Sequence, residues 1–187
     1  MHYKRYCDVF NEDWIAQAEY ESTLDPRNID TEKKMVDAIP KNVKSVLDYA
    51  CGTGRLSGYW TDYVGYDVSM HMLKLARKVR GFNNFTTTLP DRKFDAIIFD
   101  AILGHYTPPE IKTILDGVKD LTERYIIAFC WDSARGGKPT GSEYGTVSFP
   151  YQKEEWIAML GAYGEVHRQV LNDGSGRIVY LVEVNQD

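Results

Sequence analysis

The sequence predicts a doubly wound α/β fold, in which a mainly parallel sheet carries helices on both faces and closes with a C-terminal antiparallel hairpin. From residue 43 onward, short apolar runs alternate with helical stretches, the order that builds such a sheet. The runs 46–50 and 96–100 are apolar without alternation, as expected for parallel strands buried on both faces. Two further apolar runs flank a turn at 173–176 that contains Gly and Ser, which predicts the hairpin.

Two helices are expected before the sheet. The first is predicted over residues 8–21 by a stripe of apolar side chains at helical spacing. The stripe consists of Phe10, Trp14 and Ala18, and a second set at helical spacing consists of Ile15, Ala18 and Glu19. Pro26 is then expected to break the chain. Asp30 or Thr31 offers an N-cap for a second helix, which Pro40 ends.

The remaining elements follow the alternation along the chain. The expected strands are 43–50, 62–67, 82–88, 93–100 and 124–131, and the expected helical stretches are 55–60, 69–79 and 108–121. A short helix is expected at 153–164, before the hairpin strands 165–172 and 177–184. Residues 133–151 are rich in Gly, Ser and Pro and exceed an ordinary connector in length, which predicts a functional loop.

Length and charge limit the classes of protein that the chain can represent. With 187 residues a single domain over 1–187 is expected, with an N-terminal helical lid at 1–40 and a cofactor-binding core at 41–187. The net charge of -5 gives no general attraction to nucleic acid or anionic membranes. Three widely separated cysteines and no apolar run of membrane-spanning length indicate a cytoplasmic protein.

The stretch 46–54, VLDYACGTG, ends an apolar run in a small glycine-bearing turn. Such a turn between a strand and a helix lets a nucleotide-like ligand approach the backbone. A dinucleotide site would carry Gly-x-Gly-x-x-Gly, but Ser57 follows Gly52 and Gly54 at the third position. That site does not require Asp48 either. A nicotinamide-dependent oxidoreductase is therefore an alternative with an incomplete motif.

Three stretches together resemble the class I S-adenosylmethionine-dependent methyltransferases: VLDYACGTGRL at 46–56, GYDVSMHML at 65–73 and FDAIIFDAILGHY at 94–106. The resemblance implies a seven-stranded Rossmann-like methyltransferase fold and S-adenosylmethionine as cofactor, with S-adenosylhomocysteine as its product. Most family members carry Gly where this chain has Ala50. If the backbone there is left-handed, Ala costs on the order of 1 kcal/mol.

The resemblance also implies which residues bind the cofactor. Asp48 would face its methionine end, and Asp67 would accept hydrogen bonds from both ribose hydroxyls. The turn would contribute Ala50, Cys51, Gly52 and Gly54. Val68 and Met72 would pack on the adenine, although an ordinary core position explains Met72 equally well.

Two further cofactor contacts are expected from less regular parts of the motif. The family commonly has an acidic residue after the third strand, where this chain has threonines followed by leucine. Thr87 and Leu89 would then supply the adenine contacts. Near the N-terminus, the stretch DWIAQAEYE resembles the family's lid helix, and Tyr20 would be its contact with the cofactor.

The candidate catalytic residues are Asp100, His105 and Tyr106, which follow the fourth strand. Methyl transfer is an in-line displacement, so the enzyme mainly positions the reactants, and a general base is useful but not obligatory. Asp100 would also contact the cofactor, and His105 could instead brace its loop. Trp131 and Asp132 end the fifth strand and would line the acceptor pocket. No metal is expected.

The predicted function is methyl transfer to an O or N atom of a small-molecule acceptor by a monomer or homodimer. A nucleic-acid or protein methyltransferase is disfavoured by the acidic balance and by the absence of an NPPY-type sequence after the fourth strand. A non-catalytic regulatory protein that binds S-adenosylmethionine is a further alternative. The loop 133–151 is expected to cover the acceptor. Its candidate contacts are Glu143, Tyr144, Phe149 and Tyr151.

Overall fold

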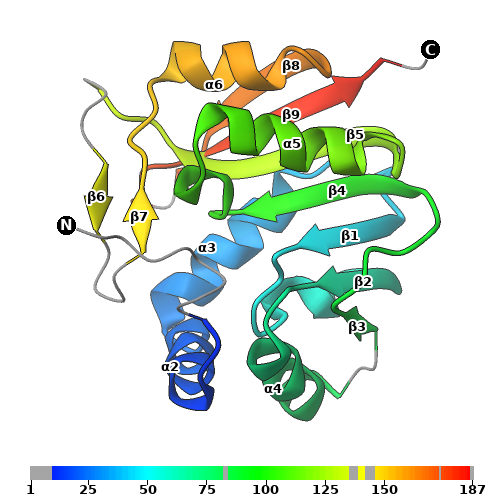
Figure 1. Ribbon diagram of the computed structural model, residues 1–187, viewed down its shortest axis with the longest axis vertical. Helices are drawn as coiled ribbons and strands as arrows, with labels where there is room; N and C mark the ends of the chain where they lie inside the picture. Colours follow the sequence, from blue (N-terminus) through cyan, green and yellow to red (C-terminus); the bar gives the residue numbers. More distant parts are fainter. Residues whose placement is uncertain (1–9, 82–83, 135–138, 142–145, 173, 186–187) are drawn as a thin grey trace.

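A computed structural model describes residues 10–81, 84–134, 139–141, 146–172 and 174–185, and these build one seven-stranded sheet with helices on both faces (Figure 1). The sheet strands are β1 (Ser45–Tyr49), β2 (Asp62–Tyr66), β3 (Phe85–Thr86), β4 (Phe94–Asp100), β5 (Thr122–Trp131), β8 (Gly164–Val170) and β9 (Arg177–Val184). The helices are α2 (Asp13–Thr23), α3 (Pro26–Asp37), α4 (Met70–Arg80), α5 (Pro108–Lys119) and α6 (Lys153–Leu160), with 3-10 turns η1 (Arg55–Gly58) and η2 (Leu103–His105). The predicted fold class is confirmed.

The strand order is β3-β2-β1-β4-β5-β9-β8, and only β9 runs against its neighbours. The order reverses between β1 and β4, so their connections leave in opposite directions and open a crevice beyond their carboxyl ends. Asp48 lies opposite Gly65 of β2 and Ile98 of β4. Side chains that follow these strands therefore meet at one edge of the sheet.

The sheet separates two hydrophobic clusters, because successive residues of a strand point to opposite faces. Leu47 of β1 belongs to the cluster that α5 and α6 cover, with Trp156 as its largest fully buried side chain. Val46 belongs to the cluster that α3 and α4 cover, together with Met35. Burial on both faces explains why β1 and β4 read as continuous apolar runs.

Helix α2 confirms the first predicted helix, and of the predicted stripe Phe10 is buried but Trp14 is not. Trp14 is 61% exposed, whereas the neighbouring Ile15 and Ala16 are buried. These two pack with Phe10 and with Met72 of α4. The buried face of α2 is therefore shifted by one residue from the predicted face, because α2 packs on α4 and not on the sheet.

The second helix begins earlier than predicted. Pro26 is its first residue and Asp25 its N-cap, whose carboxylate accepts a 2.8 Å hydrogen bond from the amide of Arg27. Proline is tolerated there because the first turn of a helix does not use its amide hydrogens. The expectation that Pro26 breaks the chain and that Asp30 or Thr31 caps the helix was wrong.

The segment between β5 and α6 is more ordered than its composition suggests. It contains a two-stranded ladder of β6 (Thr140–Gly141) and β7 (Val147–Ser148). Thr146 and Tyr151 are buried, so this segment is not wholly polar surface. Glu143 and Tyr144, two predicted acceptor contacts, lie outside the described residues. Within the described residues, no helix is both long and apolar enough to span a membrane.

Candidate active site

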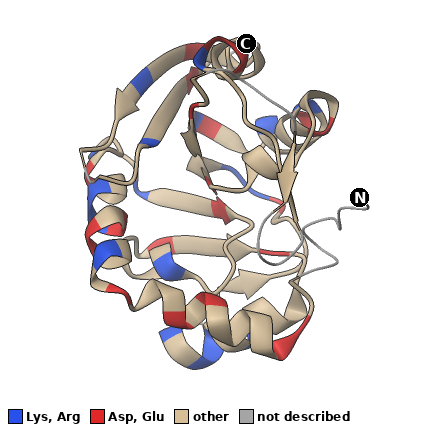
Figure 2. Ribbon diagram, turned by 90° about the vertical axis from the view of Figure 1, so that its left-hand side faces the viewer, with Lys and Arg blue, Asp and Glu red and all other residues tan. Residues whose placement is uncertain are grey.

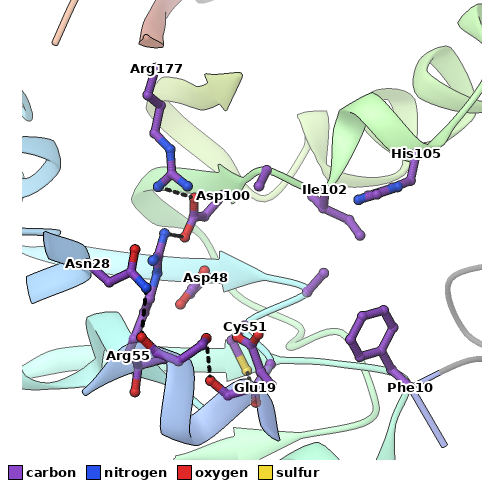
Figure 3. Close-up of a pocket in the computed structure, with 15 residues that line it drawn as sticks. Phe10, Glu19, Asn28, Asp48, Cys51, Arg55, Asp100, Ile102, His105 and Arg177 are labelled. Carbon is purple, nitrogen blue, oxygen red and sulfur yellow. Dashed lines mark hydrogen bonds and ion pairs between the residues drawn. The ribbon is translucent and has the colours of Figure 1, made fainter. Parts of the chain in front are cut away.

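A cavity of about 280 Å³ lies at the carboxyl ends of β1 and β4 (Figure 3). The turn after β1 and residues 100–102 after β4 form its floor, and α2 and α3 supply its other wall through Glu19 and Asn28. Glu19 takes the place expected for Tyr20, whose ring instead lies 5.6 Å from the guanidinium carbon of Arg80. Burial raises the pKa of the Glu19 carboxyl.

The turn after β1 is left-handed at three positions, with φ of 60° at Ala50, 53° at Gly52 and 70° at Gly54. A Cβ on Gly52 would lie 3.6 Å from Oε1 of Glu19, at the cavity wall. A Cβ on Gly54 would lie 2.5 Å from Cε1 of Phe85. Gly52 therefore brings the backbone to the cavity, whereas Gly54 does not line the cavity and packs on Phe85.

Asp48 is the last buried side chain of β1 and is 2% exposed. Its Oδ2 accepts a 2.7 Å hydrogen bond from the hydroxyl of Tyr63, and among the described residues nothing bonds to Oδ1. Burial raises the pKa of Asp48 to about 7. A buried carboxyl oxygen at a cavity wall without a protein partner fits a ligand that donates a hydrogen bond or carries positive charge.

Asp67 fixes the turn from the neighbouring strand. Its Oδ2 accepts a 2.9 Å hydrogen bond from the amide of Gly52, and its Oδ1 a 2.8 Å bond from the amide of Ser69. Asp67 is 1% exposed and does not line the cavity. Burial raises the pKa of its carboxyl, and the backbone hydrogen bonds oppose that shift.

Asp100, at the end of β4, lies between two arginines (Figure 3). Its Oδ2 pairs with Arg55 of η1, and its Oδ1 lies 3.2 Å from Nη1 of Arg177. Two guanidinium groups compensate this carboxylate, which suits a counter-ion better than a proton acceptor. Arg55 directly follows the glycine turn, but nothing in the sequence pointed to Arg177, which arrives from β9.

His105 of η2 lines this cavity and a second one. Its Nδ1 lies 2.6 Å from the carbonyl oxygen of Val147. A carbonyl only accepts, so the neutral ring carries its hydrogen on Nδ1 and its lone pair on Nε2. Tyr106 lines neither cavity and packs against the hydrophobic cluster that α5 and α6 cover. Its carbonyl oxygen accepts a 2.7 Å bond from Tyr151.

A family model described as a methyltransferase domain matches residues 46–124, from β1 into β5. Residues 46–124 form a methyltransferase domain. The resemblance to S-adenosylmethionine-dependent methyltransferases is thereby confirmed, and with it the prediction that the chain is an enzyme. No curated protein matches the chain.

Solved structures with the same fold are similar to this methyltransferase over nearly its whole length. DesVI from Streptomyces venezuelae has a TM-score of 0.70 at 14% identity, covering 98% of this chain and 100% of that one. The DhpI complex with SAH has the same TM-score and coverage at 17% identity. The 1,6-didemethyltoxoflavin-N1-methyltransferase of Burkholderia thailandensis has a TM-score of 0.68 at 18% identity, covering 97% and 89% of the two chains. At these identities the likeness establishes the fold.

The second cavity of the methyltransferase, of about 400 Å³, adjoins the first because Ala101 and His105 line both. Trp131 and Asp132 at the end of β5, the residues expected to line an acceptor pocket, line this cavity. Phe149 also lines it. Of the rings expected in the covering loop, Tyr151 instead lies in the hydrophobic core.

The residues expected to contact the adenine lie after β2, in α4 and after β3. Val68 is 53% exposed after β2, a position open to a ligand. Met72 is fully buried beneath α2, which favours the alternative that it belongs to the core. Thr87 is exposed and Leu89 packs partly against the larger cluster. Neither Thr87 nor Leu89 lines the two cavities.

Proposed function

We propose that this methyltransferase transfers a methyl group from S-adenosylmethionine to an O or N atom of a small-molecule acceptor. The observation that carries the proposal is the junction of two unlike cavities at Ala101 and His105. One is lined by charged side chains at the glycine turn, and the other largely by apolar ones. A polar cofactor and an apolar acceptor can thus meet at one point.

The residues of the first cavity fit this cofactor. Oδ1 of Asp48 would accept a hydrogen bond from the methionine ammonium group. Gly52 would let the backbone of the turn approach, and Ala50 and Cys51, which precede it, line the same cavity. A carboxylate offers about four acceptor sites, so Asp67 keeps two for the ribose hydroxyls beside its two amide bonds.

The adenine would lie outside this cavity, at the carboxyl ends of β2 and β3. Val68 would pack on the ring, since its side chain is exposed there. Thr87 and Leu89 border the same region of the chain, after β3. We assign Met72 an indirect role, because it supports α2 and α4 from within the core.

S-adenosylmethionine, when bound, would supply a methyl group on a sulfonium, and an acceptor lone pair would form the new bond to this methyl group while the S–CH₃ electron pair returns to sulfur. The proton released from the acceptor passes to Nε2 of His105, the nitrogen that carries the lone pair in the neutral ring. Asp100 holds Arg55 and Arg177 in place and does not act as the base. Positioning supplies most of the rate enhancement in such a displacement.

A small-molecule acceptor is favoured over a nucleic acid or protein by two observations. The net charge is -5, and Figure 2 shows Lys and Arg interspersed with Asp and Glu along the helices. Among the similar structures, the Burkholderia thailandensis enzyme was solved with bound 1,6-didemethyltoxoflavin and S-adenosylhomocysteine. The acceptor named for that enzyme is a small molecule.

Calorimetric titration of the full chain tests the cofactor assignment. S-adenosylhomocysteine should bind, and NAD should not. Asp48→Asn should weaken binding about tenfold or more, since it removes a charged partner of the ammonium group. Asp62→Asn is the matched control, because Asp62 is an exposed carboxylate paired with Arg92. Equal affinity in Asp48→Asn and the wild type would contradict the assignment.

The acceptor class is tested by transfer of a labelled methyl group to separated cell fractions. Label should enter the small-molecule fraction and not RNA or protein. Label in a macromolecular fraction would contradict the proposed acceptor. Cofactor binding without transfer to any fraction would favour a regulatory protein.

A further inference from the structure

The second cavity, which we propose holds the acceptor, is lined by apolar and aromatic side chains at the carboxyl end of β5. Trp131, Phe149 and Pro150 line it, and Trp156 closes its inner end. Its volume of about 400 Å³ is within the range of roughly 300–1,000 Å³ found for small-molecule sites. Aromatic linings of this kind bind ligands that present a flat apolar face.

The ring at the cavity wall is held by other rings. Phe149 stacks on Tyr151, with centroids 6.0 Å apart and an interplanar angle of 14°. Tyr151 in turn meets Trp156 edge to face at 5.0 Å. The amide of Phe149 donates a 2.7 Å hydrogen bond to the carbonyl of Gly104, which ties this residue to the loop after β4. The wall is therefore preorganised for a planar ligand.

The charge at this cavity is already neutralised. Asp132 is the carboxylate among the described lining residues, and its Oδ2 lies 2.6 Å from Nη2 of Arg168. Its Oδ1 accepts a hydrogen bond from Tyr180. Burial raises the pKa of Cys130, which keeps that thiol uncharged. A ligand with a charged group would lose hydration here without gaining an unpaired counter-charge from these residues.

We infer that the acceptor is an uncharged aromatic molecule, phenolic or with a heteroaromatic N–H, whose ring lies against Phe149 and Trp131 and whose reacting atom faces His105. The inference rests on the proposed function, because the acceptor must reach the cofactor cavity at Ala101 and His105. The inference narrows the proposed function to uncharged acceptors. A sugar amine or a phosphorylated acceptor would need a free carboxylate or a free guanidinium, and the described residues that line the cavity offer neither.

Three probes of similar size separate the contributions of ring and charge. The probes are 2-naphthol, its saturated analogue decahydro-2-naphthol, and 6-hydroxynaphthalene-2-sulfonate. Each is titrated calorimetrically into the full chain saturated with S-adenosylhomocysteine. We expect 2-naphthol to bind several-fold more tightly than the saturated analogue and at least about tenfold more tightly than the sulfonate.

A matched pair of variants locates the binding. Phe149→Leu keeps apolar volume but removes the ring, so the affinity for 2-naphthol should fall about threefold to tenfold. The affinity for S-adenosylhomocysteine should not change. Tyr59→Leu is the control, since this exposed ring lies just before β2, which β1 and β4 separate from β5 in the sheet. That variant should bind 2-naphthol as the wild type does.

Several outcomes would overturn the inference. They are tighter binding of the sulfonate, equal binding of the saturated analogue, no binding of 2-naphthol to the saturated protein, and unchanged affinity in Phe149→Leu. Each of these can occur while S-adenosylhomocysteine binds normally, and the proposed function then stands. Failure of the wild type to bind S-adenosylhomocysteine would overturn the proposed function itself.

Discussion

The hydroxyl of Tyr63 donates a 2.7 Å hydrogen bond to Oδ2 of Asp48, so one oxygen of this buried carboxyl is fixed, while the other has no hydrogen-bond partner among the described residues. Both residues are almost fully buried, and they come from adjacent strands. Burial raises the pKa of Asp48 to about 7, helped by Asp100 and Asp67, whereas Tyr63 and Arg55 act in the opposite direction.

This pKa shift predicts how stability depends on pH. The folded state holds the Asp48 proton more tightly than the unfolded chain, so its contribution is complete at low pH. It is lost as the pH rises from near 3.8 to about 7. A shift of about three pKa units corresponds to about 4 kcal/mol. Asp48→Asn should therefore be more stable than the wild type at pH 8, by up to about that amount, and nearly equal at pH 4.

Urea unfolding of both proteins across this pH range measures the difference directly. In Tyr63→Phe the hydrogen bond that lowers the pKa of Asp48 is gone, so the decline should extend to higher pH than in the wild type. The same pH dependence in Asp48→Asn and the wild type would show that folding does not raise the pKa of Asp48.

Replacing the two alanines that have a left-handed backbone conformation by glycine should stabilise the protein. Ala50 and Ala101 have φ of 60° and 62°, a conformation that costs about 1–2 kcal/mol in a residue with a Cβ. Gly substitution removes this cost but adds about 0.4–1 kcal/mol of unfolded-state entropy. Each Gly variant should gain up to about 1 kcal/mol in chemical unfolding. Ala158→Gly, exposed in α6, is the control and should lose about 1 kcal/mol. Losses of that size at Ala50 and Ala101 would disprove the backbone argument.

The two glycines of the turn should respond differently to alanine. Gly54→Ala forces a Cβ to 2.5 Å from the Phe85 ring and should cost about 2–4 kcal/mol of stability. Gly52→Ala should cost about 1 kcal/mol and mainly weaken S-adenosylhomocysteine binding, since its Cβ enters the cavity.

A double-mutant cycle with Phe85→Leu, followed by thermal unfolding, identifies the cause of the loss at Gly54. Leucine lacks the two ring atoms nearest to the added Cβ, so the double variant should lose less than the sum of the single losses. Strict additivity would mean that the backbone angle alone requires Gly54.

Asp100→Asn should lower the free energy of unfolding more than the same substitution does in an exposed ion pair. It leaves Arg55 and Arg177 together without their shared carboxylate in a partly buried site, so the cost should exceed that of an exposed pair and stay below the roughly 3–5 kcal/mol of a fully buried one. Asp62→Asn breaks an exposed pair with Arg92 and should cost less than about 1 kcal/mol. A variant of Asp100 that keeps its full unfolding free energy but loses turnover would instead identify Asp100 as the base.

The sequence by itself determined the fold and the position of the cofactor turn. Continuous apolar runs such as 96–99 are local signals, because a strand buried on both faces needs apolar residues on both of its sides. The turn after β1 was equally readable, since only small residues allow close approach of a ligand to the backbone. These features depend on neighbours in the sequence.

The tertiary structure alone decided which charges meet at the site. Arg177 lies 77 residues from Asp100 along the chain, and antiparallel pairing of β9 with β5 brings its side chain to the carboxyl end of β4. No local pattern encodes such a pairing. The face of α2 was likewise set by its partner, because packing on α4 buries Ile15 and leaves Trp14 in solvent. Long-range packing therefore chose Glu19 for the cavity, where the local motif had pointed to Tyr20.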